Sequence, residues 1–300
     1  MTLRVLRNRD FILLLALALG LFLHHGVSWT QPLTLPALAV VMTLSTMSVP
    51  DRVFRAPRAL ILPSLVGILM SYLVLSGFLL IASALLISDQ ALWEGFVILS
   101  AVPPAVAVIP FSEHLKGDGA YSLMGTVGGY IGALVLMPLV AVSILGAGFV
   151  DPRKVLLIMG ELIVTPLILS RLLIWLRVDR IINPFKGAAT NWGFFVVVYT
   201  IVGLNHDVFL HQPLILLPVA VIAVSSTFLL GLVIDWVGVR LGVEHGKRVS
   251  LVLLGTLKNY GVAGGIALAL FDKQTALPAT VSTVFMIVYV IWLNLKRRRE

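Results

Sequence analysis

The sequence contains no cysteine, which excludes disulfides, thiolate metal sites and a cysteine nucleophile. Charged residues are also scarce, at 12% of the 300 residues, against about 25% in an average soluble domain. No hydrophilic stretch is long enough to fold as a separate soluble domain. In contrast, 59% of the residues are hydrophobic and the mean hydropathy is +1.03. These features predict an integral membrane protein with a single transmembrane domain over residues 1–300.

Long apolar runs make up most of the chain. The first run follows three arginines and also resembles a secretory signal, but no small-x-small cleavage site follows it, so we expect it to remain as a span. Counted at about 20 residues for each membrane-spanning helix, the sequence predicts an all-α fold of ten spans. These spans are residues 11–28, 33–49, 59–87, 94–111, 119–148, 155–178, 191–206, 213–239, 248–271 and 276–295.

The basic residues predict how the chain is oriented, because cytoplasmic loops carry an excess of Lys and Arg. With the N-terminus inside, only Arg153, Lys154 and Lys273 fall on the outer side, and Arg171 and Lys258 lie within spans. We therefore predict a protein of the cell (inner) membrane with both termini cytoplasmic. The residues on the inner side are Arg4, Arg7, Arg9, Arg52, Arg55, Arg58, Lys116, Arg177, Arg180, Lys186, Arg240, Lys247, Arg248, Lys296, Arg297, Arg298 and Arg299.

Ten spans divide into two sets of five, and an odd number in each half places the halves in opposite orientations. This arrangement is an inverted repeat, in which corresponding spans are interrupted so that their backbone groups can form a site at the midplane. The fourth and ninth spans are the corresponding pair. In the fourth span, Pro103, Pro104 and Pro110 each remove a backbone donor and should break the helix.

The ninth span carries the second predicted break. Its glycines free the backbone and permit close approach of a neighbouring helix. Gly264 and Gly265 are the expected breaking residues, beside the polar triplet formed by Lys258, Asn259 and Tyr260.

The stretch 258-KNYGVAGGIALALF-271, the pair Pro103-Pro104 followed by 116-KGDGAYSL-123, and the ten-span layout together resemble the bile acid:sodium symporter family. The similarity extends from about the second span to the end, and only the fourth and ninth spans carry specific motifs. The resemblance implies a core bundle of spans 3 to 5 and 8 to 10 against a panel of spans 1, 2, 6 and 7. It also implies that the broken helices cross in the core, beside a cavity for an organic anion that is carried with sodium.

The sequence departs from this family where sodium would bind. The family's ninth span reads approximately E-x-x-x-Q-N, and the matching residues here are Leu254, Lys258 and Asn259. A Ser-Asn pair that supplies cation ligands in the fourth span of the family falls on Val108 and Ile109. Sodium needs several oxygen ligands, as hard cations do. The sequence therefore predicts neither a metal site nor a cofactor.

Lys258 lies near the middle of an apolar span, where a charge costs about 2.5 to 3.5 kcal/mol on insertion scales. We hypothesise that its ammonium group takes the place of the missing sodium, held by carbonyls of both broken helices, by Asn259 and by Thr126. Tyr260 and Gly261 complete the predicted site.

The sequence leaves the role of this lysine open. If Lys258 gains and loses a proton during the cycle, the carrier is proton-coupled. If it stays charged, the protein is an uncoupled facilitator or an exchanger. In a third interpretation Lys258 is static, and it either neutralises a buried acid or belongs to a hydrogen-bond network. Glu161 is the only acid deep in a span, and it either faces the cavity or snorkels to the interface.

Other polar residues in the spans carry weaker predictions. The hydroxyls of Ser45, Thr46 and Ser48 either line the cavity or bond their own backbone, and the second is expected. Asn191 and Asn205 are expected to cap the seventh helix, and Arg171 is expected to snorkel. The histidines lie at span ends or in loops without metal-binding spacing.

A secondary transporter of a small carboxylate-type organic anion, independent of sodium and working by alternating access, fits these features best. Its partners would be the anion, the lipid bilayer and, in the coupled mechanism, protons; nucleic acid is not expected, because the basic residues do not gather on one face. An ion/proton exchanger using Lys258 and Glu161, and a non-transporting receptor or scaffold, are the alternatives. The sequence has no hydrolase triad, phosphate loop or metalloprotease motif, so no enzyme is predicted.

Overall fold

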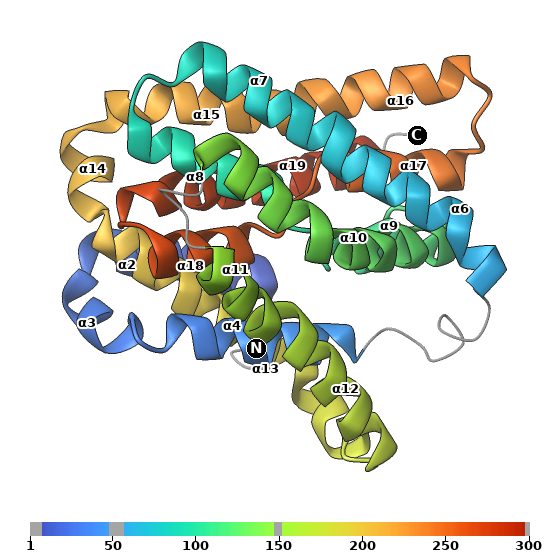
Figure 1. Ribbon diagram of the computed structural model, residues 1–300, viewed down its shortest axis with the longest axis horizontal. Helices are drawn as coiled ribbons and strands as arrows, with labels where there is room; N and C mark the ends of the chain where they lie inside the picture. The colour runs from blue at the N-terminus through green and yellow to red at the C-terminus, as the bar shows by residue number, and fades with distance from the viewer. Residues whose placement is uncertain (1–7, 48–56, 147–151, 298–300) are drawn as a thin grey trace.

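The structure is a computed structural model that describes residues 8–47, 57–146 and 152–297, and every regular element in these ranges is a helix (Figure 1). The all-α prediction is therefore confirmed for this part of the chain. The last residues of the predicted spans 33–49 and 119–148 lie outside the described residues. So do the basic residues Arg4, Arg7, Arg52, Arg55, Arg298 and Arg299.

Several helices are long and apolar enough to cross a membrane. By length and composition these are Ile61–Leu86, Gly119–Leu145, Asp179–Leu204, Pro213–Arg240 and Gln274–Leu293. A sixth candidate is the pair Phe11–Phe22 and His24–Thr30, which is bent by 92°. Thr34–Thr46 and Tyr260–Leu270 are apolar but shorter. These are the helices of a membrane protein, whereas the count of ten full crossings stays a prediction.

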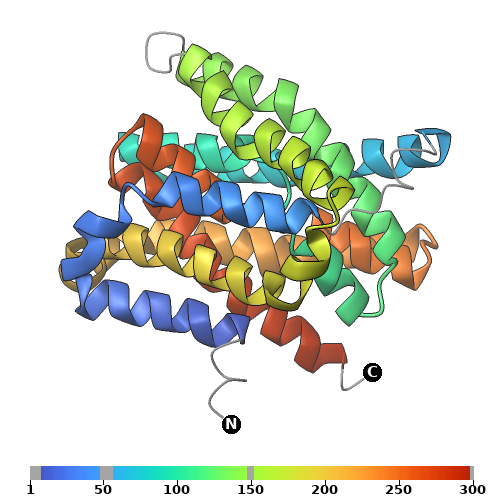
Figure 2. The same ribbon diagram turned by 90° about the horizontal axis from the view of Figure 1, so that it is seen from below.

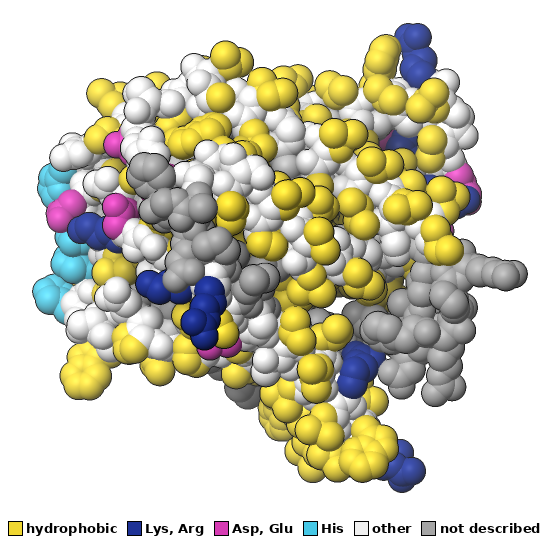
Figure 3. All heavy atoms as spheres, in the orientation of Figure 1, with side chains coloured by type: hydrophobic (Ala, Val, Ile, Leu, Met, Phe, Trp, Pro, Cys, Tyr) yellow, Lys and Arg dark blue, Asp and Glu magenta, His cyan; other side chains and the backbone are white. Residues whose placement is uncertain are grey.

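The outer surface of the helices is apolar. Leu73, Val135 and Ile168, from three different helices, are 69%, 68% and 64% exposed. Figure 3 shows hydrophobic side chains over much of one face, with histidines gathered at one end. A continuous apolar surface of this kind is stable in contact with lipid and unfavourable in water.

The described helices pack in two groups. In the smaller group, α13 packs against both α2 and α4, and α12 packs against α4. Figure 2 shows α2, α4 and α13 running side by side. The members are α2 (Arg9–Phe22), η1 (His24–Gly26), α3 (Val27–Thr30), α4 (Thr34–Thr46), α11 (Pro152–Met159), η3 (Gly160–Val164), α12 (Thr165–Trp175) and α13 (Asp179–Leu204).

The larger group contains the remaining helices except α14 (His206–His211). This short helix follows α13 and connects the smaller group to the larger one. Its main contacts join α6 to α10, α8 to α10, α15 to α19 and α16 to α17. The members are α6 (Pro57–Ile68), η2 (Leu69–Leu75), α7 (Ser76–Leu86), α8 (Gln90–Ala101), α9 (Val108–His114), α10 (Gly119–Leu145), η4 (Pro213–Leu216), α15 (Leu217–Val224), η5 (Ser225–Leu229), α16 (Leu230–Arg240), α17 (His245–Leu254), α18 (Tyr260–Leu270), η6 (Gln274–Ala276) and α19 (Leu277–Arg297).

Glycines bring α10 into backbone contact with its neighbours. A Cβ atom at Gly67 of α6 would lie 2.3 Å from the carbonyl oxygen of Gly125. One at Gly129 would lie 2.6 Å from the ring of Pro104, in the segment after α8. Small residues permit this close approach between membrane helices. As a result, α10 packs directly against the segment that contains Pro103 and Pro104.

The first predicted helix break is present between α8 and α9. Pro103 and Pro104 lie in it, and Val102 caps the end of α8 in an extended conformation. Pro110 lies instead in the first turn of α9. A proline is tolerated there because the N–H it lacks has no partner within the helix. The prediction that Pro110 breaks the helix is therefore wrong.

The second break lies between α17 and α18, and it contains Gly255. Gly264 and Gly265 lie inside α18, so the prediction that they break the helix is wrong. A Cβ at Gly264 would lie 2.5 Å from Ile201 Cδ1, and one at Gly265 would lie 2.2 Å from Leu38 Cδ1. These two glycines allow α18 to approach the smaller group closely.

Candidate functional site

The two helix breaks meet and hydrogen-bond to each other. The N–H of Ala105 donates to Leu257 O at 3.1 Å, and the N–H of Asn259 donates to Pro103 O at 2.9 Å. Pro104 and Lys258 stand opposite each other between these bonds, as an antiparallel pair. Backbone groups freed by a helix break must find partners when they are buried in a membrane protein. Here each break supplies the partners of the other.

Lys258 is enclosed directly behind this crossing. Its side chain has no exposed surface, and it is the only Lys, Arg, Asp or Glu among the described residues that is buried. Its Nζ donates to Val102 O at 2.8 Å and lies 4.1 Å from the centre of the Tyr72 ring. A positive charge is stabilised both at the C-terminal end of a helix and over an aromatic face. The ammonium therefore lies where the end of α8 attracts a cation.

Tyr72 is held in place for this contact. Its hydroxyl donates to Gly129 O of α10 at 3.3 Å, and η2 carries it into the larger group. The aromatic face is thus fixed between α10 and the lysine.

Asn259 does not hold the ammonium of Lys258, contrary to our hypothesis. Its Oδ1 accepts from the N–H of Val262 at 3.3 Å, which caps α18. Its Nδ2 donates to the hydroxyl of Tyr130 at 2.8 Å and lies 3.4 Å from Met42 Sδ. The amide therefore links the second break to α10 and to α4.

Thr126 also makes no bond to Lys258. Its Oγ1 is buried without a hydrogen-bond partner among the described residues. The side chain instead lines a narrow, mainly apolar cavity of about 90 Å³ between α10, α4 and α12. Of the predicted partners of the ammonium, only a carbonyl group of the first break is in contact with it.

Glu161 lies apart from Lys258. It is exposed in the π-helical turn η3, and it lines neither the cavity beside Thr126 nor the larger cavities of about 620 and 400 Å³. Within the described residues no carboxylate forms an ion pair with Lys258. The interpretation of Lys258 as the neutraliser of this acid is therefore wrong, and so is the cavity-facing placement of Glu161.

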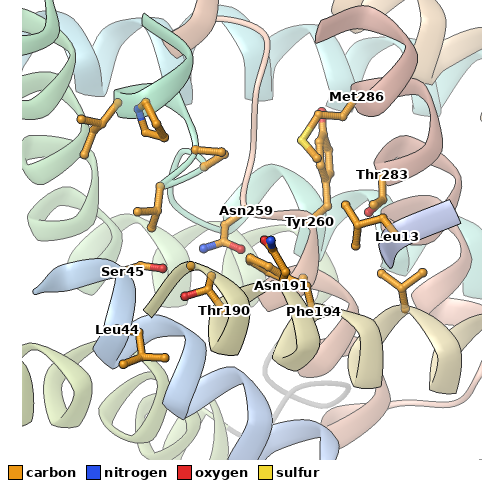
Figure 4. A pocket seen from close by; sticks show the side chains of 18 of the residues that line it. Leu13, Leu44, Ser45, Thr190, Asn191, Phe194, Asn259, Tyr260, Thr283 and Met286 are labelled. Atoms are coloured by element: carbon orange, nitrogen blue, oxygen red, sulfur yellow. The ribbon is translucent and has the colours of Figure 1, made fainter. Parts of the chain in front are cut away.

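A cavity of about 620 Å³ opens in front of the crossing, between the two helix groups (Figure 4). Asn259, Tyr260 and Gly261 form part of its wall, together with the segment after α8. Lys258 also belongs to this wall, although its side chain has no exposed surface and its ammonium is bonded to Val102 O. The other lining residues are Leu13, Leu44, Ser45, Ala105, Val106, Ala107, Ile109, Pro110, Glu113, Lys186, Gly187, Thr190, Asn191, Phe194, Val198, Thr283 and Met286.

The N-terminus of α18 points its free backbone donor at this cavity. The N–H of Gly261 makes no hydrogen bond to the described residues, whereas those of Tyr260 and Val262 are bonded. Tyr260 itself is not a free donor, because its hydroxyl donates to Thr256 O at 3.3 Å. A helix N-terminus carries partial positive charge and favours an anion.

The wall opposite this N-terminus comes from α13 and was not predicted from the sequence. Thr190, Asn191 and Phe194 lie on the cavity side of α13 (Figure 4). Asn191 is not a cap, because α13 begins at Asp179, well before the apolar run that defined the predicted span. The spacing of Lys186, Thr190 and Phe194, four residues apart, would have placed them on one helix face.

The weaker predictions had mixed outcomes. Asn205 caps the end of α13, and its Nδ2 donates to Ile201 O at 2.9 Å. Thr46 bonds its own backbone through Met42 O at 2.9 Å, whereas Ser45 lines the cavity, as the alternative interpretation allowed. Ser48 lies outside the described residues. Arg171 does not simply snorkel; its guanidinium donates to Thr46 O at 2.5 Å, at the end of α4.

The positions that match sodium ligands in the symporter family are filled by apolar side chains. Leu254 and Val108 are completely buried, and Ile109 lines the cavity. A Cβ at Gly125 would lie 2.6 Å from Leu254 Cδ1, so the leucine occupies the space beside α10. Aliphatic groups offer no oxygen to a hard cation.

No protein-family model matches this chain, and no curated protein matches it. The likeness to the bile acid:sodium symporters therefore rests on the residues quoted above and stays a prediction.

Proposed function

We propose that this protein is a secondary transporter that carries a small organic anion without sodium. The observation that carries the proposal is the cavity of about 620 Å³ that ends at the crossing of the two broken helices. A cavity at such a crossing, in a membrane protein, is a common arrangement for a substrate site.

The cavity suits a carboxylate with a compact apolar body. The N–H of Gly261 offers a hydrogen-bond donor at the cavity, and the side chains of Thr190 and Asn191 add polar groups to the wall on α13. Leu44, Phe194 and other apolar side chains cover much of the remaining wall. A pocket that combines apolar walls with a few convergent polar groups is typical of small-molecule sites.

Lys258 supplies the positive charge in this proposal. Its ammonium is bound to Val102 O behind the crossing, so it acts on the anion through its electrostatic field and not as a direct ligand. Charges act over longer range in a membrane interior than in water, because the dielectric constant is low. With the charge fixed in the chain, the transporter needs no mobile sodium.

Two contacts of the Lys258 ammonium, with Val102 O and with the Tyr72 ring, stabilise its charged form and support a fixed charge over a proton carrier. Among the described residues, no carboxylate or histidine forms an ion pair or hydrogen bond with Lys258 to exchange a proton with it. We therefore propose an uncoupled facilitator or an exchanger. The alternative function, an ion/proton exchanger that uses Lys258 and Glu161, is not supported, because Glu161 is exposed and does not contact Lys258.

We also propose that the chain forms ten spans as two inverted repeats of five. The reciprocal bonds of Ala105 with Leu257 and of Asn259 with Pro103 support this proposal, because they relate the two breaks by a local twofold axis. The larger helix group would then be the core bundle, and the smaller group the panel.

Thermal unfolding of the purified protein tests the proposed site. In choline chloride, we expect at least one of acetate, pyruvate and benzoate to stabilise the protein in a saturable manner. A ligand that binds only the folded state adds about 2.7 kcal/mol at a hundredfold excess over Kd. Replacing choline by sodium at constant ionic strength should have no effect.

The matched controls are acetamide, pyruvamide and benzamide, which have similar shapes and no charge. Equal stabilisation by the amides would contradict an anion site. Specific stabilisation by sodium would instead identify a sodium-coupled protein with relocated ligands.

A further inference from the structure

A second cavity, of about 400 Å³, lies between α16, α17 and α19 and shares no residue with the first. Its lining residues are Leu115, Lys116, Gly231, Leu232, Asp235, His245, Arg248, Val249, Val252, Leu253, Tyr289, Trp292 and Leu293. The walls are therefore mainly apolar. The charged residues lie near one another, because Arg248 contacts Asp235 and His245, and the N–H of Asp118, two residues after Lys116, donates to Gly246 O beside His245.

Neighbouring residues place this cavity at the membrane interface. Trp236 follows Asp235 on α16 and is 58% exposed, and the Arg240 guanidinium lies 4.8 Å from the centre of its ring. Exposed tryptophan and arginine side chains of this kind mark the depth of the lipid headgroups. The charged side of the cavity thus lies at headgroup depth.

Arg248 is held rigidly at this side. Its Nε donates to Asp235 Oδ1 at 2.7 Å, and its two terminal nitrogens lie 3.4 Å from Val243 O and 3.2 Å from His245 Nδ1. Asp235 offsets the charge of this arginine. The arrangement fixes the guanidinium while leaving some of its five N–H donors for another acceptor.

Lys116 adds a second positive charge at this cavity. It is exposed at the cavity and forms no ion pair with a described residue. Lys116, Arg248 and Asp235 together give the cavity a net positive charge, with His245 able to add another when protonated.

We propose that this cavity binds the phosphate headgroup of an anionic phospholipid. The phosphate would lie between Lys116 and Arg248, with an acyl chain along Leu232 and Leu293. Basic pockets between membrane helices bind acidic headgroups in this way. The apolar walls of the cavity, and its position at the depth of the lipid headgroups, favour a lipid over a free phosphate ion. The proposal does not depend on the transport function.

The test uses the full chain, delipidated in a neutral detergent. Phosphatidylglycerol should raise the unfolding temperature in a saturable manner, and native mass spectrometry should detect the bound lipid. Phosphatidylcholine with the same acyl chains, and glycerol 3-phosphate as the soluble headgroup, should have no such effect. Equal stabilisation by either of them would overturn the proposal.

Two substitutions locate the lipid. Lys116→Gln should weaken the binding of phosphatidylglycerol about fivefold, as expected for one basic residue near an acidic membrane surface. Lys247→Gln is the matched control, because Lys247 lies at the same end, pairs with Glu244 at 3.5 Å and does not line the cavity. Equal binding by both variants would place the lipid elsewhere.

A second variant tests the same cavity independently, in case Lys116→Gln does not fold. Leu232→Trp should fill the cavity from its half-exposed wall and reduce lipid binding without altering any charge. Unchanged binding by this variant would also contradict the proposal.

Discussion

Replacing Lys258 by Gln is expected to lower carboxylate uptake about a hundredfold while the protein stays folded. The amide of glutamine can still donate to Val102 O, so the substitution removes the charge and keeps a hydrogen bond. An anion at the crossing then loses its fixed counter-charge. An anion that is buried at the membrane centre without a counter-charge costs about 2.5 to 3.5 kcal/mol. A transport barrier raised by this amount lowers the rate about a hundredfold.

Two measurements separate the charge of Lys258 from a purely structural role. Uptake into proteoliposomes reports transport, and thermal unfolding reports folding. Arg171→Gln is the matched control, since Arg171 also donates to a carbonyl at a helix end but does not line the cavity. We expect this control to retain transport. Normal uptake kinetics in Lys258→Gln would show that the lysine has only a structural role.

Replacing Gly261 by Leu is expected to abolish transport and carboxylate binding together. A Cβ at Gly261 would lie 2.9 Å from Phe194 Cε1, so a leucine would fill the space between α18 and α13. It would also cover the free N–H at the N-terminus of α18. We expect the variant to fold, because the cavity can accept part of the added volume.

Phe194, whose ring lies close to any side chain added at residue 261, provides a second test. Phe194→Ala makes room beside residue 261, so the double variant should recover part of the binding that Gly261→Leu loses. Gly77→Leu is the control, because a Cβ at Gly77 would meet no atom within 4 Å. If Gly261→Leu still binds and transports carboxylates, the substrate does not occupy the proposed cavity.

Local chemistry explains which features could be predicted from the sequence. The prolines at 103 and 104 cannot continue a helix, so the end of α8 follows directly from the chain. The sequence could not show that Gly264 and Gly265 serve close packing, because glycine is typical both of a helix break and of close packing between helices. Only the neighbours of α18, Ile201 and Leu38, distinguish these two roles.

The surroundings of Lys258 show what the sequence could not supply. The charge in an apolar span indicated a special site, and a carbonyl partner was expected. Tyr72 is far away in the chain, and no local pattern links it to Lys258. Similarly, Asn191 was assigned to a helix end because hydropathy marks the apolar part of α13 and not its polar first turns.

Counterflow of a labelled carboxylate in proteoliposomes tests the central claim most directly. The probe is whichever of acetate, pyruvate and benzoate stabilises the protein most, and the comparison is between sodium and choline at constant ionic strength. We predict saturable uptake at the same rate in both salts, and uptake about a hundredfold slower in liposomes that contain Lys258→Gln. Uptake that requires sodium, or binding of the carboxylate without any uptake, would contradict a sodium-independent carrier.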